Sequence, residues 1–231
     1  MSDQPHVVHI LPAYVPGPAE NFFSYAYSQV ELSTALAATG VKVTVLSRYG
    51  EMASLERQGV AYEFITDSLP PGMRFWQVSR PLIKRVQQLA PDIIHYHGLH
   101  YPFMLQQLAK AKHGHSRLIG EYHSDLLSSG IKGWLQKRGL AVMERLLFTN
   151  PAHMTTWQQS TGLPSERFKF SLEASSTLSY QDRVSARSQT GMTGSPVFLW
   201  NSRLIARRDP QTVLRGFELL LATWPKARRY M

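Results

Sequence analysis

Short apolar runs recur along the first 150 residues of the chain, separated by longer amphipathic stretches. Several of the runs are rich in β-branched residues and are apolar at consecutive positions, as strands buried on both faces of a parallel sheet tend to be. They cover residues 7–11, 41–46, 60–65, 92–97, 117–122 and 145–149. We therefore expect a β-strand at each of these six places.

The stretches between the runs have the periodicity of α-helices. Phe22, Ala26 and Val30 share one helical face, and Gly40 is a natural end for that helix. Residues 150–162 predict another helix, because an Asn-Pro pair supplies the cap and first turn and a glycine supplies the stop. Repeated alternation of strand and helix predicts an α/β fold built on a doubly wound parallel sheet.

The composition changes after residue 180. Residues 181–194 are polar and small and have no clear period, so we expect a linker there between a domain at 1–180 and a second unit at 195–231. The second unit offers an apolar run at 196–200 and an amphipathic helix that begins near Asp209. One strand and one helix cannot enclose a core. We therefore expect residues 195–231 to be the incomplete start of a second domain, in a truncated chain whose tail approaches a strand that does not follow.

Candidate chemistry lies just after the apolar runs, because ligands of open α/β sheets bind beyond the carboxyl ends of the strands. Polar residues and glycines in these positions are Gly17, Glu20, His97, His100, His123, Asp125, Arg203 and Arg208. His95, His97 and His100 are also spaced so that they could be read as a metal cluster. No carboxylate or thiol is evident beside them, so we predict no metal site, and we expect His95 to be a packed strand residue.

Composition narrows the classes of function. The chain has no cysteine, which excludes disulfides, thiol catalysis and thiolate metal sites. Its 25 basic and 16 acidic residues give a net charge of +9, which favours phosphates and anionic lipid surfaces as partners. No nucleic-acid-binding motif accompanies the charge, so we expect no nucleic-acid partner. With no secretory signal layout and no membrane-spanning run, we expect a cytoplasmic protein.

Five motifs, in order over nearly the whole chain, are shared with a known family. They are G-x-x-V-x-V-L at 40–46, P-D-I-I-H-x-H at 91–97, Y-H-S-D at 122–125, G-x-P-x-x-R-F at 162–168 and S-R-L-I-x-x-R-D-P at 202–210. No single motif is diagnostic, but their order and spacing are specific. The chain resembles the retaining nucleotide-sugar glycosyltransferases of family 4, which have two Rossmann-like domains in the GT-B arrangement.

The resemblance implies a first domain that binds the acceptor and a second that binds most of the nucleotide sugar, with no cofactor or metal. Arg203 and Arg208 would then neutralise the leaving diphosphate, and the backbone at Gly17 would approach the donor. His123 would contact the donor sugar, with Asp125 orienting it or capping the segment that follows. Glu20, His97 and His100 would line the cleft on the acceptor side. The acceptor would be a glycan or glycolipid in surface polysaccharide assembly.

Several positions depart from the family pattern. Gly17 is followed by Pro18 and Ala19 where the family has paired glycines, and residues 173–176 replace an N-G-V-D motif. Ser202 stands where the family has glycine and Arg208 where it has lysine. In the family, the acidic pair that grips the nucleotide sugar lies downstream of residue 231.

Three alternatives stay open at this point. The chain could be a non-catalytic binding module that uses an apolar stripe of Phe217, Leu221 and Trp224, or part of a nucleotide-sugar epimerase of the same architecture. The third is a peripheral contact with anionic lipid at the inner face of the membrane, made by the basic segment at 132–138 through Lys132, Lys137 and Arg138.

Overall fold

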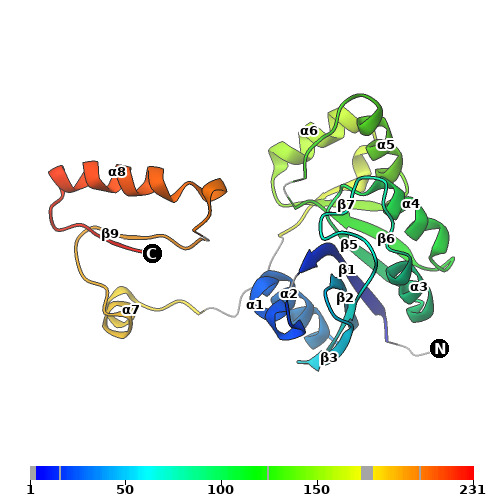
Figure 1. The fold of residues 1–231 in the computed structure, drawn as a ribbon, viewed down its shortest axis with the longest axis horizontal. Helices are drawn as coiled ribbons and strands as arrows, with labels where there is room; N and C mark the ends of the chain where they lie inside the picture. The colour runs from blue at the N-terminus through cyan, green and yellow to red at the C-terminus, as the bar shows by residue number, and fades with distance from the viewer. Residues whose placement is uncertain (1–3, 16, 124, 173–178, 203) are drawn as a thin grey trace. The chain divides into compact units, whose positions relative to one another are not determined.

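The computed structural model describes residues 4–15, 17–123, 125–172, 179–202 and 204–231. The chain divides into two compact units, residues 1–177 and residues 178–231. Each unit has its own β-sheet (Figure 1).

The first unit is built on an eight-stranded sheet in the order β3-β4-β2-β1-β5-β6-β7-β8. Every neighbouring pair is parallel except β3 and β4 at one edge. The strands are β1 (His6–Val15), β2 (Lys42–Tyr49), β3 (Ala53–Arg57), β4 (Val60–Ile65), β5 (Ile93–His97), β6 (Arg117–Glu121), β7 (Arg145–Phe148) and β8 (Phe168–Phe170). The six expected strands and the doubly wound α/β sheet are confirmed, and β3 and β8 are additional edge strands.

Helices cover the two faces of this sheet. They are α1 (Phe22–Tyr25), α2 (Tyr27–Ala38), α3 (Arg80–Leu89), α4 (Pro102–Ala111), α5 (Gly130–Leu140) and α6 (Pro151–Thr161). One apolar cluster joins α3, α4, α5 and α6 to side chains such as Val8 and Ile94, and a second joins α1 and α2 to side chains such as Val43 and Val45. Because successive strand residues point to opposite faces, these two clusters form the cores on either side of the sheet.

The predicted helix signals operate as expected in α6. The Asn150 side chain accepts hydrogen bonds from the N–H groups of Ala152 and His153, at 2.8 and 3.3 Å. Pro151 occupies the first turn, and Gly162 ends the helix in the left-handed region with φ of 60°. The cap, the proline and the glycine together fix both ends of this helix before β8.

The second unit contains α7 (Arg183–Thr190), β9 (Val197–Leu199), the 3-10 helix η3 (Ala206–Arg208), α8 (Pro210–Thr223) and β10 (Arg228–Tyr230). The expectation of an irregular linker at 181–194 was wrong in part. Asp182 accepts hydrogen bonds from the N–H groups of Val184 and Ser185 and so begins α7. The expectation that no strand follows α8 was also wrong, because β10 pairs in parallel with β9.

The second unit has little interior. Among its described residues, Ala227 alone is buried. Phe217 of α8 packs edge-on against Phe198 of β9, with 5.9 Å between ring centroids, while Trp224 at the end of the helix is half exposed. No helix in the described part of the chain has the length and apolar character needed to cross a membrane.

Candidate functional site

Four histidines and one glutamate gather toward the carboxyl ends of three neighbouring strands. The strand register places His9 of β1 beside His95 of β5, and His97 of β5 beside Glu121 of β6. Residues two apart in a strand share a face, so His95 and His97 point to the same side of the sheet, and His123 follows Glu121 by two positions. We call these five residues the histidine cluster.

One carboxylate oxygen is the centre of the cluster. Glu121 Oε2 lies 3.0 Å from His97 Nδ1, 3.3 Å from His95 Nε2 and 3.4 Å from His123 Nε2. The ring of His97 bridges two further neighbours. Its Nδ1 is 3.0 Å from His123 Nε2, and its Nε2 is 2.9 Å from His9 Nδ1. The five side chains therefore form one continuous polar network.

Burial controls the charges in the cluster. Burial alone would raise the pKa of Glu121, but its contacts with His123, His95 and His97 outweigh that effect and hold the pKa well below the usual value. Burial, reinforced by the neighbouring His95, lowers the pKa of His97 to about 4. Burial also lowers the pKa of His9 well below its usual value. At neutral pH the glutamate is therefore ionised, and His9 and His97 are neutral.

The cluster borders a cavity on the α2 side of the sheet. The cavity has a volume of about 330 Å³ and is lined by side chains from the cluster and from α2, among them His9, His95, Glu121, Leu32, Leu36 and Leu147. His123, with a side chain 21% exposed, gives the network a more open edge. A small polar ligand or an ion therefore has access to otherwise buried polar atoms.

Asp125 contacts two of the other sequence-predicted residues, His100 and His123. Its Oδ2 accepts a hydrogen bond from the backbone N–H of His123 at 3.1 Å, and its Oδ1 contacts His100 Nδ1. Asp125 is buried, which would raise its pKa, but the contact with His100 outweighs burial and lowers it. In the described contacts, Asp125 thus fixes the main chain at His123 and the ring of His100, while the His123 ring faces His97 and Glu121.

The other predicted site residues lie elsewhere. Gly17 has a φ of 104°, which favours glycine, and follows β1; Glu20 is exposed in the 3-10 helix η1 (Ala19–Asn21). Arg208 is exposed in η3 of the second unit, and Arg203 lies outside the described residues. The structure thus brings His97 and His123 together and pairs His100 with Asp125.

Two functional-site residues escaped the sequence analysis because they lie inside apolar runs. Glu121 is the last residue but one of the run at 117–122, and His9 lies within the run at 7–11. Glu121 is the carboxylate whose apparent absence led to the prediction of no metal site. A charged residue inside a strand that is otherwise apolar is the signal that would have identified it.

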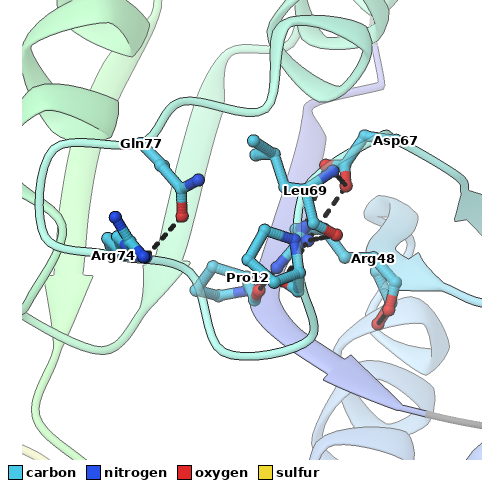
Figure 2. A network of polar contacts seen from close by, with 8 residues as sticks. Pro12, Arg48, Asp67, Leu69, Arg74 and Gln77 are labelled. Atoms are coloured by element: carbon cyan, nitrogen blue, oxygen red, sulfur yellow. Dashed lines mark hydrogen bonds and ion pairs between the residues drawn. The ribbon is translucent and has the colours of Figure 1, made fainter.

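A second buried polar network supports the loops beside β1 and β2. Arg48 is 1% exposed and forms a two-pronged ion pair with Asp67, each N–O distance being 2.9 Å (Figure 2). Its guanidinium also donates to the main-chain oxygens of Pro12, Leu69 and Pro70 at 3.1–3.4 Å. Arg48 therefore ties the loop before α3 to β1 and β2, the strands next to the cluster.

Comparisons with known proteins agree on the fold. About 98% of the chain superposes on 61% of sucrose-phosphate synthase from Thermosynechococcus elongatus, with a TM-score of 0.59 and 15% identity. The same share superposes on 60% of HepE from Anabaena in complex with UDP and glucose, with a TM-score of 0.62 and 17% identity. A glycosyltransferase from Rickettsia africae aligns with 99% of the chain over 68% of its own length, with a TM-score of 0.61 and 10% identity.

The chain thus spans about three fifths of the length of the first two structures. No curated protein sequence matches it. The Rossmann-like fold is that of GT-B glycosyltransferases. Residues 27–169, more than half of the 231 residues, match the sequence profile named Glycosyltransferase Family 4. The protein therefore belongs to Glycosyltransferase Family 4.

Proposed function

We propose that this chain contains the acceptor-side domain of a retaining glycosyltransferase that moves a sugar from a nucleotide-sugar donor to a glycan or lipid-linked acceptor in surface polysaccharide assembly. The observation that carries the proposal is the contact of His97, Glu121 and His123 at the carboxyl ends of β5 and β6. Ligands of open α/β sheets bind at these ends. Membership of a glycosyltransferase family supplies the reaction class.

His123 is the residue that contacts the donor sugar in this proposal. Its ring lies at the partly exposed edge of the cluster, 3.4 Å from the buried carboxylate of Glu121. Asp125 fixes its main chain from the other side. The ring and the main chain of His123 are both held in place, so His123 loses little conformational freedom when it binds the sugar. A hydrogen bond to the sugar that strengthens in the transition state then lowers the activation barrier.

The donor diphosphate is assigned to the second unit. Arg208 is exposed immediately before α8, and it belongs with Arg203 to the family motif at 202–210. Guanidinium groups neutralise the charge that develops on a leaving diphosphate. HepE was solved with UDP and glucose, which makes UDP-sugars the first donors to examine.

A lipid-linked acceptor requires contact with a membrane surface, and the start of α5 has suitable chemistry. Two apolar side chains of α5 are strongly exposed, Ile131 at 80% and Trp134 at 55%, and Leu126, in the segment before the helix, is 83% exposed. Three exposed basic residues accompany them on the same helix: Lys132, Lys137 and Arg138. The guanidinium of Arg138 lies 4.7 Å from the centroid of the Trp134 ring. We assign this surface to an anionic lipid headgroup layer.

The test is turnover of a panel of UDP-, GDP- and ADP-sugars, with glycan and lipid-linked acceptors, by the 231-residue chain and by any longer form that its gene encodes. We expect a longer form to produce a glycoside that retains the anomeric configuration of the donor, as read by NMR of the product. An epimerised nucleotide sugar as the only product would replace the proposal with an epimerase. Failure of every form to bind or turn over any nucleotide sugar would refute catalysis.

A further inference from the structure

We propose that the histidine cluster is a binding site for a four-coordinate transition-metal ion, with zinc as the best fit, His97, Glu121 and His123 as its protein ligands and a water molecule in the fourth position. This site goes beyond the proposed glycosyl transfer, for which the family resemblance implies no metal. It also reverses the sequence-based prediction, because that prediction lacked the carboxylate of Glu121.

The distances within the histidine cluster fit a tetrahedral metal site. Ligand atoms of a tetrahedral zinc site lie ~2.1 Å from the metal, so neighbouring ligand atoms are roughly 3.4 Å apart. His97 Nδ1, Glu121 Oε2 and His123 Nε2 form a triangle with sides of 3.0, 3.0 and 3.4 Å. His95 Nε2 lies 3.3 Å from the same carboxylate oxygen. A small adjustment of side-chain torsions places the three atoms of the triangle around one ion, with His95 beside them.

The imidazole rings of the histidine cluster carry too few protons to satisfy all of its polar contacts. A neutral imidazole has a single N–H group. His97 Nδ1 faces Glu121 Oε2 and His123 Nε2 at the same distance of 3.0 Å, so one proton cannot serve both contacts. His95 Nε2 and Glu121 Oε2 are buried, and among the described residues neither has a hydrogen-bond partner with good geometry. A divalent cation between Glu121 Oε2, His97 Nδ1 and His123 Nε2 binds their lone pairs and balances the buried carboxylate charge.

The types of ligand atom in the histidine cluster, and the contact that His9 makes with the ring of His97, favour zinc. Two imidazole nitrogens and one carboxylate oxygen are ligands that suit zinc, whereas magnesium and calcium prefer oxygen alone. His9 supplies the outer contact that metal-bound histidines usually have, since its Nδ1 lies 2.9 Å from His97 Nε2. The cavity of about 330 Å³ beside His9, His95 and Glu121 gives the ion a route inward.

The experiment is a titration of the tag-free chain with Co²⁺, a spectroscopic substitute for zinc, followed by displacement with Zn²⁺. Four-coordinate Co²⁺ absorbs visible light much more strongly than six-coordinate Co²⁺, so the spectrum reports the geometry directly. We expect one equivalent to bind with the strong spectrum and to be released by zinc. Substitutions Glu121→Gln, His95→Asn and His123→Asn are each expected to weaken binding at least about tenfold.

The matched control is a second pair of histidines on the surface. His113 and His115 are exposed, with ring centroids 5.8 Å apart, and lie outside the cluster. The double variant His113→Asn/His115→Asn should bind Co²⁺ as the unaltered protein does. Circular dichroism checks the folding of each variant, and His123→Asn, at the partly exposed edge, carries the test if Glu121→Gln does not fold.

Two results would overturn the metal site: a spectrum of six-coordinate Co²⁺ only, or binding that survives the cluster substitutions and disappears in the surface variant. The titration contains no nucleotide sugar. A negative result therefore leaves the proposed transferase untouched, and a failed transfer assay leaves the metal site untouched.

Discussion

The Nδ1 atom of His97 lies 3.0 Å from the Oε2 atom of Glu121, and this contact joins the ends of β5 and β6. The main chain reinforces the junction, because the N–H of Gly98 donates to the carbonyl of Glu121 at 2.8 Å. Two adjacent strands thus present a neutral imidazole and a buried carboxylate to the same point. His123 lies at the partly exposed edge of the histidine cluster, at the carboxyl ends of the strands, where ligands of open α/β sheets bind.

The cluster makes the stability of the protein sensitive to acid. His97 is neutral in the folded protein down to about pH 4, whereas an unfolded histidine binds a proton below about pH 6.5. The unfolded state therefore binds more protons between these values, and the free energy of unfolding falls as the pH drops through this window. A shift from 6.5 to about 4 corresponds to roughly 3 kcal/mol.

The lowered pKa of Glu121 acts in the same direction, because its stabilising contribution is present above its unfolded pKa and is lost as the pH falls toward its folded value. Urea unfolding between pH 7.5 and 4.5 measures the loss that comes from His97, and the loss from Glu121 adds to it below about pH 4.5. The variant His97→Asn should flatten this dependence, and His113→Asn on the surface should not. A free energy of unfolding that stays constant over the range in the unaltered protein would contradict the buried, neutral state of His97.

Arg48 is predicted to be a main support of the loop before α3. Replacing it with alanine leaves Asp67 buried without its ion-pair partner and removes three contacts to main-chain oxygens. Loss of one partner of a buried pair costs about 3–5 kcal/mol. The matched control is Arg85→Ala, which breaks a more exposed pair with Glu63 and should cost about 1 kcal/mol or less. Equal losses in denaturant unfolding would show that burial of Arg48 does not matter.

The exposed surface of α5 is predicted to bind anionic vesicles. Trp134→Ala should reduce sedimentation with vesicles of phosphatidylglycerol, because it removes the aromatic side chain that enters the interface. Trp76→Ala is the matched control, since Trp76 is also about half exposed and has the guanidinium of Arg74 5.6 Å from its ring. Equal binding to zwitterionic and anionic vesicles would rule out this surface. An equal loss of binding in the Trp134→Ala and Trp76→Ala variants would also rule it out.

Much of the fold could be predicted from local patterns alone. The six buried strands are apolar runs with clear ends, and α6 has its cap, proline and glycine at the predicted places. The edge strand β3 was missed because its side chains are mostly exposed and polar, so they lack an apolar signal. Helix α7 was missed because its stability depends on the cap at Asp182 more than on an apolar face.

The candidate site was less predictable for a different reason. His97 and His123 could be placed near the carboxyl ends of strands, but their contact depends on β5 and β6 being neighbours. His9 enters the cluster only because β1 lies on the other side of β5. Strand order is a property of the whole sheet, and local patterns do not specify it. Glu121 and Arg48 look like interruptions of apolar runs until their distant partners are known.

The most direct test of the account is the rate of sugar transfer by His123→Asn, measured in a chelating buffer so that loss of a bound metal cannot explain the result. His113→Asn serves as the surface control. The account predicts that His123→Asn retains its fold and loses kcat by roughly 10²–10³-fold, as removal of a donor to the transition state does in other enzymes. A kcat within about twofold of the unaltered protein would contradict the assignment of His123 to the donor sugar.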